Sequence, residues 1–128
     1  MKKSSRWVVV IAAAILFTAC TNVTSREVKH IVVFKYKSTA SPAQIQEVTA
    51  AFVALKDKIP GITSFEYGVN NSPENFNKGF THVYLLTFKD ALARDQYLPH
   101  PEHKKFGDLL GRLGILEEPF VVDFEVQK

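Results

Sequence analysis

The stretch VKHIVVFKYK (residues 28–37) decides the fold, because it predicts a strand with two different apolar faces. It is rich in β-branched and aromatic residues, which favour strands. One face would carry Val28, His30, Val32, Phe34 and Tyr36, and the other Lys29, Ile31, Val33, Lys35 and Lys37. Because successive side chains of a strand point to opposite sides, both faces are expected to meet another layer or a partner.

Three further strands are predicted beyond this stretch, at residues 62–70, 80–88 and 118–126, where apolar side chains recur at every second position. A helix is expected between the first two strands, over residues 42–59. It would begin with the capping sequence Ser-Pro-Ala-Gln at 41–44 and end at the Pro-Gly pair that follows.

Two more helices are predicted before the last strand, at residues 90–98 and 101–113. The order β-α-β-β-α-α-β predicts an α+β unit, with helices on one face of an antiparallel four-stranded sheet. The other face would expose apolar side chains such as Ile31, Val33 and Val83. An apolar face of this size usually has a partner, so we expect a two-fold homodimer that pairs its sheet faces.

The beginning of the chain has the features of an export signal. Residues 1–6 are positively charged, residues 7–17 are apolar, and small residues then lead to Cys20, the only cysteine. This pattern is typical of a secretory signal, and its end resembles a bacterial lipobox. In that resemblance the cysteine is acylated and becomes the new N-terminus.

These features divide the chain into a lipoprotein signal peptide at 1–19, a lipidated tether at 20–27 and a folded domain at 28–128. Acyl chains on Cys20 would hold the protein on a membrane, at about 0.8 kcal/mol per buried CH₂ group. We therefore expect an exported, membrane-anchored lipoprotein that faces the periplasm. Thr21 after the cysteine resembles lipoproteins sorted to the outer membrane.

The positive net charge of the chain belongs to the signal peptide. The chain has 16 basic and 13 acidic residues, and Lys2, Lys3 and Arg6 are the charged residues of 1–19, which leaves 13 of each sign. A nucleic-acid partner is therefore not expected. The sequence also has no glycine-rich phosphate loop, no G-x-S-x-G turn and no CxxC pair.

The stretch YLPHPEH (97–103) contains the first candidate site residues. His103 would lie in the first turn of a helix, whose positive end favours a neutral imidazole that acts as a general base. Tyr97 is a candidate donor of a hydrogen bond to a carbonyl or enolate oxygen. In the structural alternative, His100 caps the helix and His103 anchors it to a strand, and both interpretations stay open.

His30 and His82 are further candidates, because each shares a predicted strand face with aromatic residues. They predict a ligand pocket between sheet and helices, lined also by Val32, Tyr84 and His100. The alternative is that these histidines are buried and hydrogen-bonded within the fold. A metal site is not expected, because His-Pro-Glu-His lacks the HExxH spacing that places two histidines on one helix face.

Four segments resemble, in order and spacing, the stress-responsive dimeric α/β-barrel family, abbreviated Dabb. They are VKHIVVFKYK, IPGITSFEYGVNNSPENFNKGFTHVYLLTF, YLPHPEHKKF and VVDF, which lie within residues 28–125. The resemblance implies a ferredoxin-like unit that pairs its sheet with that of a second copy to form a dimeric barrel.

One branch of that family consists of plant polyketide cyclases, which work without a metal or cofactor. The resemblance therefore implies that this chain needs neither. In those enzymes a tyrosine and a histidine placed as Tyr97 and His103 carry the chemistry, and histidines matching His30, His82 and His100 also occur. Two functions therefore stay open. One is a lipid-anchored stress-response protein that binds a small apolar or aromatic molecule without turnover. The other is a cofactor-free lyase or cyclase, with His103 as base and Tyr97 as acid.

Overall fold

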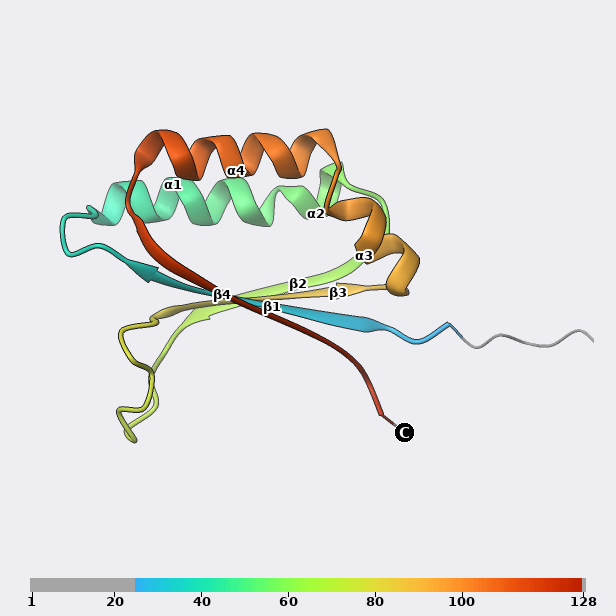
Figure 1. Cartoon of the computed structure of the whole chain (residues 1–128), viewed down its shortest axis with the longest axis horizontal. Coiled ribbons are helices and arrows are strands. Elements are labelled where there is room, and N and C mark those ends of the chain that lie inside the picture. Colours follow the sequence, from blue (N-terminus) through green and yellow to red (C-terminus); the bar gives the residue numbers. More distant parts are fainter. Residues whose placement is uncertain (1–24, 128) are drawn as a thin grey trace, which may run out of the picture.

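An antiparallel sheet with all of its helices on one side forms the framework of the protein, as Figure 1 shows. The structure is a computed structural model that describes residues 25–127. The elements are β1 (Val28–Tyr36), α1 (Pro42–Val53), α2 (Leu55–Lys58), β2 (Ile62–Val69), β3 (His82–Phe88), α3 (Ala91–Tyr97), α4 (Pro101–Leu113) and β4 (Leu116–Glu125). The strand order is β2-β3-β1-β4, so β1 lies in the interior of the sheet. This confirms the predicted ferredoxin-like α+β fold. The signal peptide, Cys20 and most of the tether lie outside the described residues.

The predicted helix at 42–59 is divided by a turn at Ala54 into α1 and α2. The N–H of Asp57 donates to the carbonyl of Ala54 at 3.3 Å, a three-residue step that tightens the chain at this point. The predicted start of α1 is confirmed as a capping box. Gln44 N–H donates to Ser41 Oγ, and Ser41 N–H donates to the Gln44 side chain.

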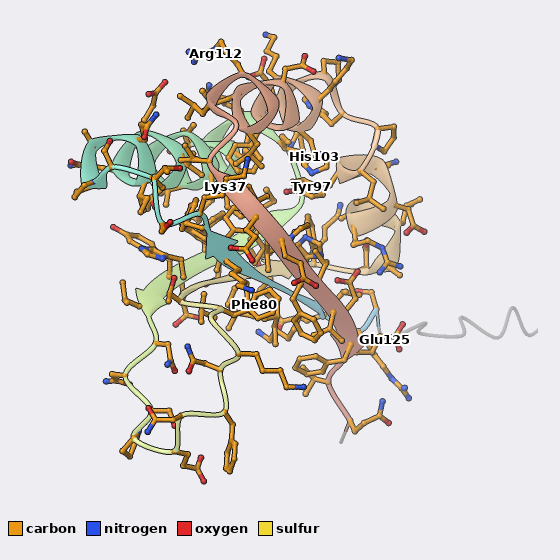
Figure 2. All side chains as sticks on the ribbon, turned by 60° about the vertical axis from the view of Figure 1, so that its left-hand side comes forward. Lys37, Phe80, Tyr97, His103, Arg112 and Glu125 are labelled. Carbon is orange, nitrogen blue, oxygen red and sulfur yellow. The ribbon has the colours of Figure 1, made fainter. Side chains whose placement is uncertain are left out.

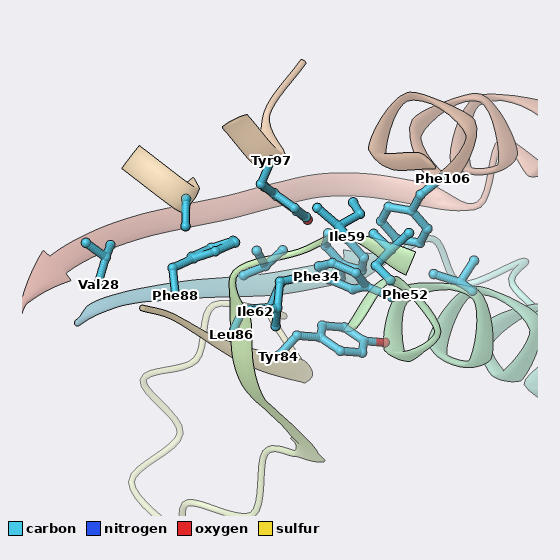
Figure 3. Close-up of a cluster of buried hydrophobic side chains, with 14 of the residues drawn as sticks. Val28, Phe34, Phe52, Ile59, Ile62, Tyr84, Leu86, Phe88, Tyr97 and Phe106 are labelled. Carbon is cyan, nitrogen blue, oxygen red and sulfur yellow. The ribbon is translucent and has the colours of Figure 1, made fainter. Parts of the chain in front are cut away.

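The face of β1 that packs on the helices forms the core with β3. Val28, Val32 and Phe34 are each less than 5% exposed. Above them the aromatic rings of Phe34, Phe52 and Phe106 stack in sequence, with centroids 6.0 Å and 4.4 Å apart, and Figure 3 shows these side chains together. Each such side chain contributes about 1.5–3 kcal/mol when fully buried.

A close approach fixes α3 over the end of the sheet. Gly61, at the turn before β2, has φ +95°, a conformation that favours glycine. A Cβ atom at this position would lie 2.6 Å from Cβ of Ala93 in α3. The absence of that side chain lets α3 pack against the turn, and this contact helps to place Tyr97 at the end of the helix.

The opposite side of the sheet has no helix within the described residues (Figure 1). In the β1–β4 register, Phe120 pairs with Val33 and Val122 pairs with Ile31. Together with Phe124 these residues define what we call the outer face, where Phe120, Val122 and Phe124 are 52%, 43% and 48% exposed. The prediction of an uncovered apolar face is confirmed. Within residues 25–127, no helix is both long and apolar enough to cross a membrane.

Candidate functional site

Three of the predicted site residues meet on the helix side of the sheet. His30 comes from β1, Tyr97 from the last residue of α3 and His103 from the first turn of α4. The ring centroids of Tyr97 and His103 lie 4.4 Å apart, and those of His30 and Tyr97 lie 5.7 Å apart. Figure 2 shows Tyr97 and His103 next to each other beneath α4. We call these residues, with Arg94 and Asp123, the Tyr97 cluster.

The Tyr97 hydroxyl is buried without a hydrogen-bond partner among the described residues, and the whole side chain is 0% exposed. A buried hydroxyl is normally paired, because leaving one unpaired costs about 1–3 kcal/mol. Burial raises the pKa of Tyr97, and the negative charge of Asp123 raises it further. The group is therefore a protonated phenol at physiological pH and has a hydrogen bond to offer.

His103 has one ring nitrogen fixed by the backbone. Its Nδ1 lies 2.9 Å from the carbonyl oxygen of Leu98, at the point where α3 ends before Pro99. A carbonyl only accepts, so Nδ1 carries the proton and donates it. In the neutral imidazole the other nitrogen, Nε2, is then an acceptor, which is the form a general base needs.

His30 is paired with a carboxylate that no sequence pattern had singled out. Its Nδ1 lies 2.6 Å from Asp123 Oδ1, on the neighbouring strand β4. Arg94 of α3 donates from Nη1 to the other oxygen of Asp123 at 2.5 Å. The alternation of β4 could have indicated Asp123 as a site residue. Its side chain lies on the helix side of the sheet, whereas Phe120, Val122 and Phe124 lie on the outer face. Arg94 precedes Tyr97 by one helical turn.

His82 lies away from the Tyr97 cluster. It pairs with Phe34 of β1, whereas His30 pairs with Leu86, so four residues of strand separate the two histidines. This spacing corresponds to roughly 13 Å. The His82 ring packs on Tyr36 with centroids 5.0 Å apart, and burial lowers its pKa. The two histidines are therefore not in contact, and His82 lies outside the Tyr97 cluster.

A separate groove includes His82. It has a volume of about 410 Å³ and lies between α1 and the end of β2, where Ile45, Tyr67 and Val69 also line it. Tyr67 and Val69 are 62% and 64% exposed. A groove of this volume lies within the range of small-molecule sites.

The other predicted ligand contacts are engaged inside the fold. His100 caps α4, with its Nδ1 accepting from the N–H of Glu102 at 3.1 Å. Val32 is part of the core, and the Tyr84 hydroxyl lies 2.8 Å from Thr49 Oγ1. Within the part of the chain that the structure describes, no three His, Cys, Asp or Glu side chains form a group able to hold a metal ion.

Comparison with known proteins gives a family for this fold. A family model described as "Stress responsive A/B Barrel Domain" matches residues 28–126. The chain is 32% identical over 98 residues to the stress-response A/B barrel domain-containing protein HS1 of Arabidopsis thaliana, covering 77% of this chain and 88% of that protein. It is 33% identical over 82 residues to olivetolic acid cyclase of Cannabis sativa, covering 64% and 81%.

Solved structures agree with this assignment. A hydroxynitrile lyase from Passiflora edulis superimposes with a TM-score of 0.73 at 26% identity, covering 80% of this chain and 95% of that one. A dimeric ferredoxin-like protein of unknown function from Jannaschia sp. CCS1 gives a TM-score of 0.67 at 29% identity, covering 78% and 99%. Similar folds thus occur in enzymes and in dimers.

Proposed function

The chain belongs to the stress-responsive A/B barrel family, and we propose that it binds a small carbonyl compound and moves a proton on the carbon next to the carbonyl. One observation carries this proposal. The Tyr97 hydroxyl is buried, unpaired among the described residues and packed against an imidazole with one free acceptor nitrogen. The relative named as a cyclase supports this chemistry, and the hydroxynitrile lyase supports acid–base chemistry with a carbonyl compound more generally.

In this mechanism, His103 Nε2 takes a proton from the carbon beside the carbonyl and becomes an imidazolium. The electron pair of the broken C–H bond moves onto the carbonyl oxygen, which becomes an enolate. Tyr97 donates a hydrogen bond to that oxygen while its negative charge develops. In a cyclisation the enolate carbon then bonds to the carbon of a second carbonyl group, and the electron pair of that C=O bond moves onto its oxygen, which takes the proton from His103. The reverse sequence breaks the same C–C bond. Every step uses side chains of this chain.

The proposal is tested by deuterium exchange, which needs no knowledge of the natural substrate. The purified full-length chain in detergent is mixed with acetylacetone in D₂O, and loss of the methylene proton signal is followed by NMR. We expect exchange faster than in buffer alone. Exchange that is no faster than the buffer control, also with benzoylacetone as a larger aromatic probe, would contradict the proposed chemistry.

A second candidate function is binding without turnover, and the His82 groove favours it. This groove is open to solvent, whereas Tyr97 is completely buried. The two functions predict different sites for an aromatic ligand such as benzaldehyde. In an NMR titration, shifts confined to Ile45, Tyr67 and His82 would support binding alone, and shifts at Tyr97 and His103 would support the acid–base site.

We propose that the outer face pairs with a second copy of this chain, and the dimeric ferredoxin-like relative supports self-association. Val122→Lys would place a charge in that apolar contact, where burying it without a partner costs several kcal/mol. We expect the variant to sediment as a monomer at micromolar concentration and the parent as a dimer. Val121→Lys is the matched control, because the neighbouring side chain is 52% exposed on the helix side of β4. A parent monomer, or equal effects of both substitutions, would contradict the pairing.

We also propose that Cys20 carries a lipid anchor, as the signal pattern of residues 1–20 indicates. Expressed in a Gram-negative host, the parent should fractionate with the outer membrane. Cys20→Ser should release at least half of the protein from washed membranes, because acyl chains are the main source of membrane affinity in this interpretation. Unchanged retention of Cys20→Ser in washed membranes would count against lipidation, and Ser25→Ala, outside the signal, is the control.

A further inference from the structure

Asp123 links a histidine and an arginine that come from different elements of the fold. His30 of β1 contacts Oδ1 at 2.6 Å, and Arg94 of α3 donates to Oδ2 at 2.5 Å. His30 is 5% exposed, and the side chains of Arg94 and Asp123 are both 24% exposed. Ion pairs at this level of burial interact more strongly than surface pairs, because less water screens them.

We propose that Arg94 is a positioning residue of the Tyr97 cluster, which acts through Asp123 to keep His30 neutral, with the proton on Nδ1 and Nε2 left as an acceptor for the ligand. This role rests on the proposed function and adds His30 to it, because the ring of His30 lies 5.7 Å from that of Tyr97. The role depends on the contact between Arg94 of α3 and Asp123 of β4.

The argument follows from the charges around His30. A carboxylate alone beside an imidazole favours the imidazolium, since opposite charges attract in a site with little water. With Arg94 present, the negative charge of Asp123 is already balanced. A second cation on His30 would then leave an excess positive charge in a mostly buried site, which is unfavourable.

The other neighbours of His30 do not change this balance. Phe88 meets the ring edge-on with centroids 5.9 Å apart, and Tyr97 is a neutral phenol. His103 lies on the far side of Tyr97, with its Nδ1 bonded to the carbonyl of Leu98. Asp95 also accepts from Arg94, at 2.6 Å, but its side chain is 61% exposed and water screens its charge.

The same carboxylate acts on Tyr97. After burial, the negative charge of Asp123 is the second cause that raises the pKa of Tyr97. Burial and Asp123 keep Tyr97 a protonated donor. Arg94, which donates to Asp123, fixes the position of that carboxylate. A donor and an acceptor are thereby maintained next to each other.

The test follows the histidine side chains of the ligand-free, full-length chain by NMR with ¹⁵N-labelled histidine, in detergent. In Arg94→Met we expect His30 to take up its proton about one pH unit higher than in the parent, a tenfold gain in proton affinity. In Asp123→Asn we expect the opposite displacement and loss of the fixed Nδ1–H form. Arg94→Lys keeps the charge and should titrate close to the parent.

A purely structural role would not produce displacements of opposite sign. Unchanged His30 titration in Arg94→Met, or displacement to lower pH, would overturn the proposal. If that variant does not fold, Arg94→Gln tests the same expectation, because glutamine retains hydrogen-bond donors but has no charge. His30 should again take up its proton at higher pH than in the parent. The titration needs no substrate, so it can succeed when the exchange assay fails, and exchange by the parent can be real while His30 does not respond to Arg94.

Discussion

Replacing His103 by alanine is expected to slow deuterium exchange into acetylacetone by about 100- to 10,000-fold, the usual contribution of a general base. The substitution removes the acceptor nitrogen Nε2 and also the bond from Nδ1 to the carbonyl of Leu98. The rate is measured by NMR at saturating acetylacetone, so that weaker binding does not contribute. His103→Gln keeps a donor toward Leu98 but is not a base, and it should be as slow as His103→Ala.

Tyr97→Phe separates the roles of the two cluster residues. Loss of one donor to a developing oxyanion typically lowers the rate about 100- to 1,000-fold. Because the lost hydroxyl has no partner among the described residues, the variant should fold at least as stably as the parent. Lys104→Ala is the control on the same helix, since Lys104 pairs with Asp108 on the exposed side of α4. Equal rates for Lys104→Ala and His103→Ala would contradict the assignment of the base.

Phe52→Ala is expected to lower the free energy of unfolding by about 3–5 kcal/mol, a large part of the roughly 5–15 kcal/mol available to a domain. Phe52 is 2% exposed and touches the rings of Phe34, Phe65, Tyr84 and Phe106, with centroids between 4.4 and 6.0 Å apart. Its removal would leave a cavity between α1, α4 and the sheet that these stiff rings fill poorly.

Urea unfolding of the full-length chain in detergent, followed by circular dichroism at a fixed protein concentration, measures this effect. Leu92→Ala is the control, because Leu92 lies on α3 and is 64% exposed. Surface substitutions usually change stability by less than about 0.5 kcal/mol. A loss below 1 kcal/mol for Phe52→Ala would mean that the aromatic stack does not hold the helices on the sheet.

Local patterns in the sequence were sufficient for the framework and for part of the site. Alternation in residues 28–37 separates the buried Val32 from the outer Val33, because a strand has a strict period of two. Capping residues mark the starts of α1 and α4, since backbone N–H groups there need nearby acceptors. The partnership of Tyr97 with His103 also follows from their short separation across a helix break.

Contacts between distant segments were not predictable in the same way. Asp123 reaches His30 only because β4 lies beside β1 in one particular register. Arg94 joins them only because α3 packs over that end of the sheet. The strand pattern places His82 and His30 on the same face of the sheet. It does not show how far apart they lie along the strands, and in the structure His82 lies opposite Phe34, four positions along β1 from His30. The division of the helix at Ala54 has no proline or glycine to mark it.

The position of β1 in the sheet has a consequence for how the chain folds as it is made. Its pairing with β4 joins Val28 to Glu125, so the interior strand keeps an open edge until nearly the whole domain has left the ribosome. Pairings of such long sequence separation form late and slowly. During that interval the edge of β1 is available to other unfinished chains. Synthesis that stops before β4 should therefore yield aggregates rather than a smaller folded unit.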